Sequence, residues 1–149
     1  MVAWNQGVVD AMKKIFSVFG VLTVSIILLT AGLSCSSENK ISLGQEFALS
    51  VGSTVVISGE DLSLKFVEVT ADSRCPTGVV CVWAGEAKCR MLVIYQGTES
   101  EVVFTQPGSS AGMQNLFQKY TVSFKLEPYP ESGKQIESAD YKLIATITK

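Results

Sequence analysis

The sequence predicts an all-β protein, a single antiparallel β-sandwich of about seven strands that follows an N-terminal signal or lipoprotein helix. Two observations support this fold class. Apolar and polar residues alternate along several segments of the chain, and turn-forming residues recur about every eight to twelve positions. An immunoglobulin-like order of the strands is compatible with this pattern.

The strands are expected where the alternation is clearest. They are residues 47–51, 54–58, 62–69, 87–95, 101–105, 120–127 and 141–147. Gly52 and Ser53 predict a tight hairpin between the first two strands. The proline-containing segments 107–110 and 128–133 are expected to be loops, because proline fixes φ and lacks a backbone donor.

Three segments depart from simple alternation. The apolar parity changes at Phe66 and Val67, which predicts a β-bulge. Residues 87–95 are apolar on both parities in their second half, so we expect a central strand that is covered on both sides. Residues 112–119 alone have apolar side chains at helical spacing, which predicts a short connecting helix.

The N-terminal segment has the layout of a signal peptide. Residues 15–33 carry no charge, and they follow Lys13 and Lys14. Two cations before an apolar run are the features that direct a chain out of the cytoplasm. We therefore expect residues 1–34 to be a removable leader, with Met12 as an alternative start of translation.

The end of the leader resembles a prokaryotic lipobox, in which a cysteine is acylated before the leader is removed. Residues 31–35 match only the permissive form, because Leu33 stands two places before Cys35. The resemblance implies a lipid on Cys35, a flexible tether over residues 35–41 and a folded domain over residues 42–149. An uncleaved membrane anchor and simple secretion are the alternatives, and all three place the domain outside the cytoplasm.

The number and distribution of charged residues in the chain limit the partners that we expect. Without residues 1–34 the chain has 115 residues, of which 13 are acidic and 10 basic, so its net charge is near −3. No run of basic residues is present, and nucleic acid is therefore not an expected partner.

The expected partners are the membrane, through the lipid anchor, and a protein or glycan ligand. The expected location is the cell envelope, at the outer membrane if the host has one, a sorting with which Ser36 is compatible.

The remaining cysteines predict one disulfide. Once the lipidated cysteine is set aside, Cys75, Cys81 and Cys89 allow three pairings and leave one free thiol. We favour Cys75 with Cys81, because Pro76 and Gly78 bend the short segment between them. Closing so short a loop contributes about 2 kcal/mol in the chain-entropy model.

The third of these cysteines is expected to be a buried thiol. Cys89 shares its strand parity with Met91 and Val93, which favours a small apolar side chain in the core. A three-thiolate metal site is the alternative. The cysteine spacings match no zinc ribbon, and the chain has no histidine, so no metal and no cofactor are expected.

The segment around these cysteines carries a family resemblance. Residues 72–87, DSRCPTGVVCVWAGEA, resemble a motif of small uncharacterised prokaryotic lipoproteins and secreted domains. Residues 126–130 and 141–143 resemble the ending of the same family. The resemblance implies a bridge between Cys75 and Cys81 and a β-rich fold, but no known activity.

Three side chains of this segment are candidates for ligand binding. Trp83 could stack on a sugar or a peptide side chain, and Arg74 offers a rigid set of donors, with Glu86 close in sequence. A structural role is the alternative. In that case Trp83 would cover the core above the disulfide, and Arg74 would pair with Asp72 or Glu86.

These observations predict a noncatalytic cell-envelope lipoprotein that binds an unknown ligand. The chain has no histidine for a catalytic triad, and its candidate carboxylates lie in separate segments, so no catalytic residue is expected. Those carboxylates are Asp61, Asp72, Glu86 and Asp140. A protease inhibitor that uses the disulfide-pinned segment 74–81 is the second hypothesis, and a weak hydrolase is the third.

Overall fold

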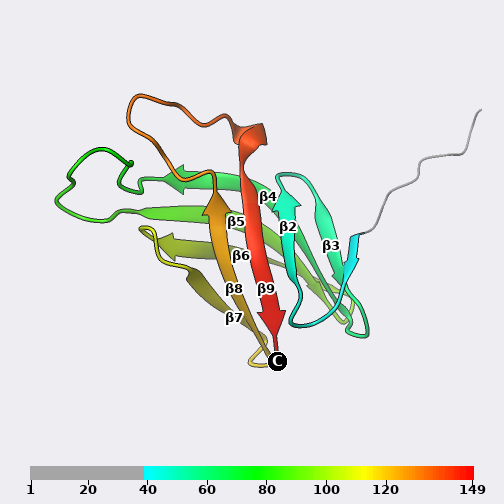
Figure 1. Ribbon diagram of the computed structural model, residues 1–149. Helices are drawn as coiled ribbons and strands as arrows, with labels where there is room; N and C mark the ends of the chain where they lie inside the picture. The colour runs from blue at the N-terminus through cyan, green and yellow to red at the C-terminus, as the bar shows by residue number, and fades with distance from the viewer. Residues whose placement is uncertain (1–38) are drawn as a thin grey trace, which may run out of the picture. The chain divides into compact units, whose positions relative to one another are not determined.

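A computed structural model describes residues 39–149, which form two β-sheets packed face to face (Figure 1). The predicted all-β sandwich is confirmed. The elements are β1 (Asn39–Ile41), β2 (Glu46–Ser50), β3 (Thr54–Ile57), β4 (Leu62–Asp72), β5 (Glu86–Tyr95), β6 (Thr98–Pro107), β7 (Gly112–Leu116), β8 (Tyr120–Glu127), the 3₁₀ turn η1 (Ser138–Asp140) and β9 (Lys142–Thr148). The predicted leader, Met12 and Cys35 lie outside the described residues.

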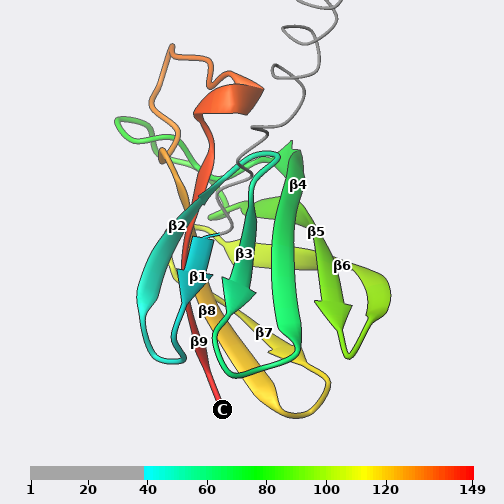
Figure 2. The same cartoon turned by 90° about the vertical axis from the view of Figure 1, so that its right-hand side faces the viewer.

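The two sheets differ in their connections. One holds β1-β3-β4-β5-β6, and the other holds β2-β9-β8-β7, so the layers lie on either side of one core (Figure 2). All pairs are antiparallel except β1 with β3, which are parallel. An immunoglobulin domain pairs its strands in the orders A-B-E-D and C-F-G. The four consecutive strands β3 to β6 of one sheet do not follow that arrangement.

The described residues form nine strands rather than about seven, because the alternation of apolar and polar residues did not indicate two short strands. β1 begins at Asn39, inside the segment expected to be a tether, and buries Ile41 against the sandwich. β7 occupies Gly112–Leu116, where a helix was expected. That prediction was wrong because Gly112 faces inward: a Cβ there would lie 2.4 Å from the Phe124 ring. Because glycine has no side chain, the sequence showed no apolar residue at this inward position, and the alternation typical of a strand was not recognised.

The predicted hairpin at Gly52 and Ser53 is also wrong. β2 pairs with β9 and β3 pairs with β4, so these two residues carry the chain from one sheet to the other. The Gly52 N–H donates to the carbonyl of Phe66, 2.6 Å away, which fixes the crossing. Both strands bury one face, Leu49 in β2 and Val55 in β3, and a short turn does not reveal which partner strand each will choose.

The β4–β5 pair is the long centre of the larger sheet. The predicted bulge is confirmed, because the register shifts between Phe66 and Glu68, and a second shift follows near Ala71. β5 is an interior strand of its sheet, between β4 and β6, but the prediction that both of its faces are covered is wrong, because no layer lies on its outer face. Leu92 and Ile94 point outward there, and Ile94 is 36 % exposed. Cross-strand neighbours shield these side chains only in part.

The core lies between the sheets and is made of apolar side chains from all the strands. Its largest fully buried members are Tyr120, Phe66, Phe104, Phe124, Leu49, Ile57, Leu62, Leu64, Met91, Leu126, Leu143 and Ile147. Burial of each aliphatic or Phe side chain contributes roughly 1.5–3 kcal/mol before entropy is counted. In residues 39–149 no helix is long and apolar enough to cross a membrane.

Candidate functional site

The segment between β4 and β5, residues 73–85, projects from one end of the sandwich (Figure 1), and we call it the cysteine loop. A disulfide joins Cys75 to Cys81, whose Cα atoms are 5.9 Å apart. The bridge that the sequence favoured is therefore present. It closes residues 75–81 into a small covalent ring within the projection.

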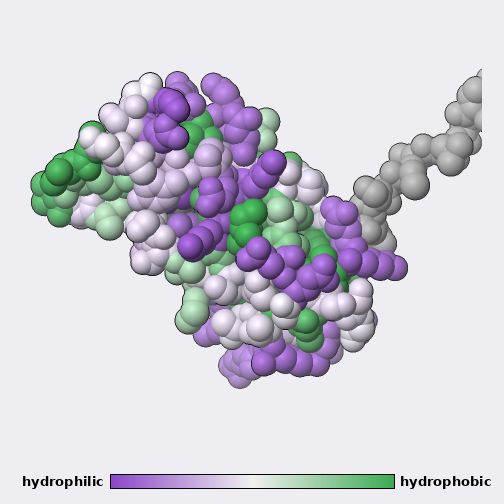
Figure 3. Space-filling view, in the orientation of Figure 1, coloured by the Kyte–Doolittle hydropathy of each residue, from purple (hydrophilic) through white to green (hydrophobic). Residues whose placement is uncertain are grey.

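Four apolar side chains, Val79, Val80, Val82 and Trp83, crowd the end of the cysteine loop, and we call them the apolar tip. Val80 and Val82 are fully exposed, with relative accessibilities of 102 %, and Trp83 is 81 % exposed. Figure 3 shows apolar side chains gathered on this projection. Single exposed apolar residues are ordinary, whereas a cluster of them on a protruding loop is unusual for the surface of a folded domain.

Trp83 therefore does not cover the core above the disulfide, which was the structural alternative for this residue. The interior beneath the cysteine loop holds Arg74 and Tyr141 instead, and both are buried. With that space filled by a guanidinium and a phenol ring, the indole has no cavity to enter and stays in solvent.

Arg74 is the anchor of the cysteine loop. Its Nε donates to Oδ1 of Asp72 at 2.8 Å, and its Nη2 donates to Oδ2 of the same carboxylate at 2.6 Å. The guanidinium also donates to the carbonyls of Leu126, at 2.6 Å, and Pro128, at 3.0 Å. The Tyr129 ring centroid lies 5.0 Å from its central carbon. One side chain thus joins the end of β4 to the end of β8.

This network shifts the acidity of its members. Burial by itself would raise the pKa of Asp72, but the hydrogen bonds and the charge of Arg74 outweigh burial and lower that pKa. Burial and the neighbouring Asp72 carboxylate raise the pKa of Tyr141 to about 12. The Tyr141 hydroxyl donates to Oδ2 of Asp72 at 3.1 Å. Asp72 is therefore a charged carboxylate surrounded by donors.

The three candidate binding residues do not form one cluster. Arg74 is only 2 % exposed and is paired with Asp72, so its guanidinium faces the interior rather than a ligand. Glu86 lies at the start of β5 and forms an exposed ion pair with Lys88 at 2.9 Å. Of the three, Trp83 is the side chain that the structure presents to solvent as a contact surface.

A second loop supports the ring from the side. The Thr77 N–H donates to the carbonyl of Pro130 at 2.9 Å, and the Ser132 N–H donates to the carbonyl of Thr77 at 3.2 Å. Thr77 and Glu131 thereby form an isolated parallel bridge. The disulfide ring is consequently fixed to the β8–β9 connection as well as to its own strands.

Two residues that the sequence interpretation missed hold the base of the loop. Gly85 has φ of +70°, and a Cβ there would lie 1.8 Å from the carbonyl oxygen of Ser73, so only glycine fits. Gln106 is buried, and its Oε1 accepts the Leu126 N–H at 2.6 Å. The alternation that makes Phe104 face inward would also have indicated Gln106, but the predicted strand ended one residue earlier, at Thr105.

Cys89 is a buried free thiol, as the strand parity predicted. Burial raises its pKa to about 12. A thiol that stays protonated and has no access to solvent is neither a nucleophile nor a metal ligand at neutral pH. Its role is therefore that of a small core side chain.

The opposite end of the sandwich carries a charged cluster centred on Glu60. Its carboxylate accepts hydrogen bonds from Lys149 at 2.5 Å, from the Tyr120 hydroxyl at 2.5 Å and from Lys119 at 3.4 Å. The hydrogen bonds from Lys149 and Tyr120 lower the pKa of Glu60 to about 2. This cluster ties the turn before β4 to the last residue of the chain.

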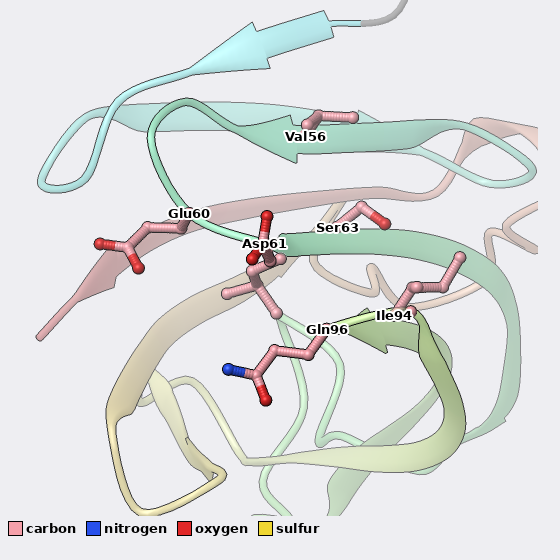
Figure 4. A pocket seen from close by; sticks show the side chains of 8 residues that line it. Val56, Glu60, Asp61, Ser63, Ile94 and Gln96 are labelled. Atoms are coloured by element: carbon pink, nitrogen blue, oxygen red, sulfur yellow. The ribbon is translucent and has the colours of Figure 1, made fainter.

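A shallow hollow of about 670 Å³ adjoins this cluster (Figure 4). Val56, Ser63 and Ile94 form its floor on three neighbouring strands, and the small Ser63 between two larger side chains makes the depression. Its charged and amide side chains, such as Asp61 and Gln96, lie along one edge. A ligand site normally has polar groups that converge on one point, and this surface does not.

The candidate carboxylates remain dispersed in the folded domain. Asp61 lies near the Glu60 cluster, Asp72 lies under the cysteine loop, Glu86 begins β5, and Asp140 is in η1. Within residues 39–149, no three Cys, Asp or Glu side chains come together in a group that could hold a metal ion.

Comparison with known proteins identifies no relative. No protein-family model matches the chain. No curated protein and no solved structure matches it either. The functional argument therefore depends on the geometry of the cysteine loop and its surroundings.

Proposed function

We propose that the protein is a noncatalytic binding domain of the cell envelope, exported by its leader and held at the membrane by a lipid on Cys35. The uncharged segment after Lys13 and Lys14 and the lipobox-like residues 31–35 support export and lipidation. The disulfide between Cys75 and Cys81 supports the same location, because such bridges persist in oxidising compartments.

The apolar tip is the proposed binding surface, and its occupant is a protein with a concave apolar site. The observation that carries this proposal is the exposure of Trp83 and the two neighbouring valines on a segment that is fixed at its base. Tryptophan is one of the three side chains, with tyrosine and arginine, that most often dominate affinity in protein interfaces. A loop that is already ordered loses less entropy on binding than a flexible one.

A protein partner fits the tip better than a glycan does. Sugar recognition combines an aromatic face with donors and acceptors for the hydroxyl groups, yet residues 79–83 carry no hydroxyl, amide or charged side chain. Three valines and a tryptophan match instead the dry centre of a protein interface.

The position of the tip also favours a partner beyond the protein's own membrane. Strand β1, with which the described chain begins at Asn39, and the cysteine loop lie on opposite sides of the domain (Figure 1). The four residue steps from Cys35 to Asn39 reach at most about 14 Å. The 11 residues of β4 alone span roughly 36 Å. A short lipid tether therefore keeps the Asn39 side near the membrane, with the tip further out.

A noncatalytic role agrees with how the polar groups are used. The most concentrated polar network, Arg74 with Asp72 and Tyr141, is buried and satisfied by protein partners. Catalytic groups must reach a substrate, and these side chains do not.

The experiment is site-specific photocrosslinking in the native envelope. A photoreactive side chain at Val82 should capture one protein, whereas the same group at Met113, a 73 % exposed residue of β7, should not. The captured protein is then purified, and its affinity for the wild type and for Trp83→Ser is measured. We expect at least a tenfold loss for the variant.

Three results would contradict the proposal. The purified protein could bind Trp83→Ser as tightly as the wild type. The tip could bind vesicles of neutral phospholipid while no protein is captured. A glycan fraction could quench Trp83 fluorescence without any protein contact.

A further inference from the structure

The backbone of the apolar tip is free to pair with another chain. Among the described residues, no N–H from Gly78 to Trp83 donates to a backbone carbonyl, although Thr77 and Cys75 on one side and Ala84 on the other are bonded. Six consecutive amides are thus available at an exposed position. Unpaired backbone of this kind is what an extended peptide offers to a cleft that binds it through main-chain hydrogen bonds.

The free segment is held at both ends. The Cys75 N–H donates to the carbonyl of Ala84 at 2.9 Å and so joins the two flanks of the segment, and Thr77, on the Cys75 side, is also bonded to the β8–β9 connection. The bridge from Cys75 to Cys81 closes residues 78–81 of the segment into a ring and leaves Val82 and Trp83 outside it. A peptide restrained in this way binds with a smaller entropy loss than a free substrate and dissociates more slowly.

Val80 is the last residue of the ring before Cys81. It is fully exposed, and it precedes Cys81, so the peptide bond after Val80 lies inside the disulfide-closed segment. Hydrolysis of that bond would add one water molecule and create a new carboxylate and a new amine. Both ends would stay joined through the Cys75–Cys81 bridge, so cleavage would release no fragment.

The side chains restrict which cleft could accept this segment. From Cys75 to Gly85 the sequence contains no Lys, Arg, Asp or Glu, so a primary pocket that requires a charge would find no match. Val80 offers a small branched aliphatic group, which fits the small primary pocket of elastase-type peptidases. Trp83, three residues later, adds a large apolar contact outside the ring.

We infer that the ring segment centred on Val80 occupies the active-site cleft of a peptidase with a small aliphatic primary pocket, and thereby inhibits it. This inference depends on the proposed function, because it assigns the class of protein that the apolar tip meets. The disulfide and the Arg74 anchor hold the segment in its bound shape.

The test uses the purified oxidised protein with two peptidases, elastase and trypsin, and three forms of the chain. The wild type should inhibit elastase and leave trypsin unaffected. Val80→Arg should lose at least a hundredfold of the elastase inhibition and should inhibit trypsin, since arginine fills a pocket that carries an acid. Val103→Arg, which places the same charge on the exposed face of β6, should behave like the wild type.

Three outcomes would overturn the inference. The first is that neither the wild type nor Val80→Arg inhibits either enzyme at micromolar concentration. The second is that Val80→Arg and the wild type give the same two inhibition constants. The third is that the ring is cut rapidly without inhibition, which would make it a substrate. In each case the photocrosslinking at Val82 would still report whether the tip binds a protein, so failure of the inference and failure of the proposed function are separable.

Discussion

The two ends of the sandwich use charged residues in opposite ways. Under the cysteine loop, the Arg74–Asp72 pair is buried, while the apolar side chains of the tip face solvent. At the other end, Lys119 and Lys149 lie at the surface around Glu60, and the aromatic ring of Tyr120 is buried beneath them. The Arg74–Asp72 pair is buried beneath an exposed apolar loop, whereas the Lys119 and Lys149 cations lie at the surface above a buried aromatic ring.

The Glu60 cluster covers aromatic groups of the fold, whereas the cysteine loop leaves apolar side chains exposed to solvent. The cations of the Glu60 cluster cover aromatic rings, with the Lys119 ammonium 5.0 Å from the Tyr120 ring centroid. That arrangement shields apolar area from water. At the cysteine loop the buried Arg74–Asp72 pair instead fixes the position of an exposed segment. The side chains of the apolar tip are more exposed than Phe117 at the other end, which is 42 % exposed and stacks on Tyr95.

The largest expected effect comes from removal of the loop anchor. Arg74→Ala leaves the buried Asp72 carboxylate without its cation, and breaking a buried pair in this way costs about 3–5 kcal/mol. Chemical denaturation at pH 7 measures the loss. Because an unpaired buried carboxylate has a raised pKa, the defect should shrink as the pH falls and Asp72 is protonated.

Arg90→Ala is the matched control for this variant. Arg90 forms an ion pair with Glu68 at 2.8 Å on the outer face of β5, where its side chain is 36 % exposed. Exposed pairs contribute up to about 1 kcal/mol. Equal losses for Arg74→Ala and Arg90→Ala would show that Arg74 is not a special anchor.

The disulfide comes next in magnitude. The double variant Cys75→Ser and Cys81→Ser should lower the free energy of unfolding by about 2 kcal/mol, because it restores the loop entropy of the unfolded chain. The Cys89→Ala background prevents new disulfides during the measurement. A loss close to zero would indicate that the hydrogen bonds of Thr77 and Cys75 alone determine the shape of the ring.

A smaller effect with a clear pH signature is expected at the opposite end. Folding lowers the pKa of Glu60 from 4.5 to about 2, so its stabilising contribution is present above pH 4.5 and is lost as the pH falls towards 2. Glu60→Gln should lower Tm at pH 7, and the difference from the wild type should close between pH 4.5 and 2. Glu101→Gln, on β6, is the control. A gap that persists at pH 2 would refute the assigned role of Glu60.

The smallest effect on stability should come from the tip itself. Trp83 makes little contact with the domain, so Trp83→Ser should change the free energy of unfolding by no more than about 0.5 kcal/mol. Thermal unfolding monitored by circular dichroism measures this change. A loss above about 2 kcal/mol would mean that Trp83 packs into the core after all, and the comparison between the two ends would fail.

The sequence was informative where side-chain alternation was unbroken. β8 and β5 match their predicted segments to within one residue, and the bulge at Val67 follows from the parity change. Pairing was not predictable at Gly52, because a turn between two strands gives no information on whether they share a sheet. β7 was missed because Gly112 supplies space rather than an apolar side chain.

The candidate site was only partly predictable for a similar reason. The Cys75–Cys81 bridge and the Arg74–Asp72 pair follow from residue types at short spacing. The exposure of Val80 does not, since valine usually marks a strand or a core position. Whether an apolar residue in a loop is buried depends on distant elements, here Tyr141 and Gln106, which fill the space beneath the loop.

The central claim is that the apolar tip is exposed and yet rigid. ¹⁵N relaxation of residues 78–83 tests it most directly, because these amides lack backbone partners and report only the restraint from the ring and its anchor. We predict order parameters near 0.85, as in the strands. Values below about 0.6 would show a flexible loop and would contradict a preformed binding surface.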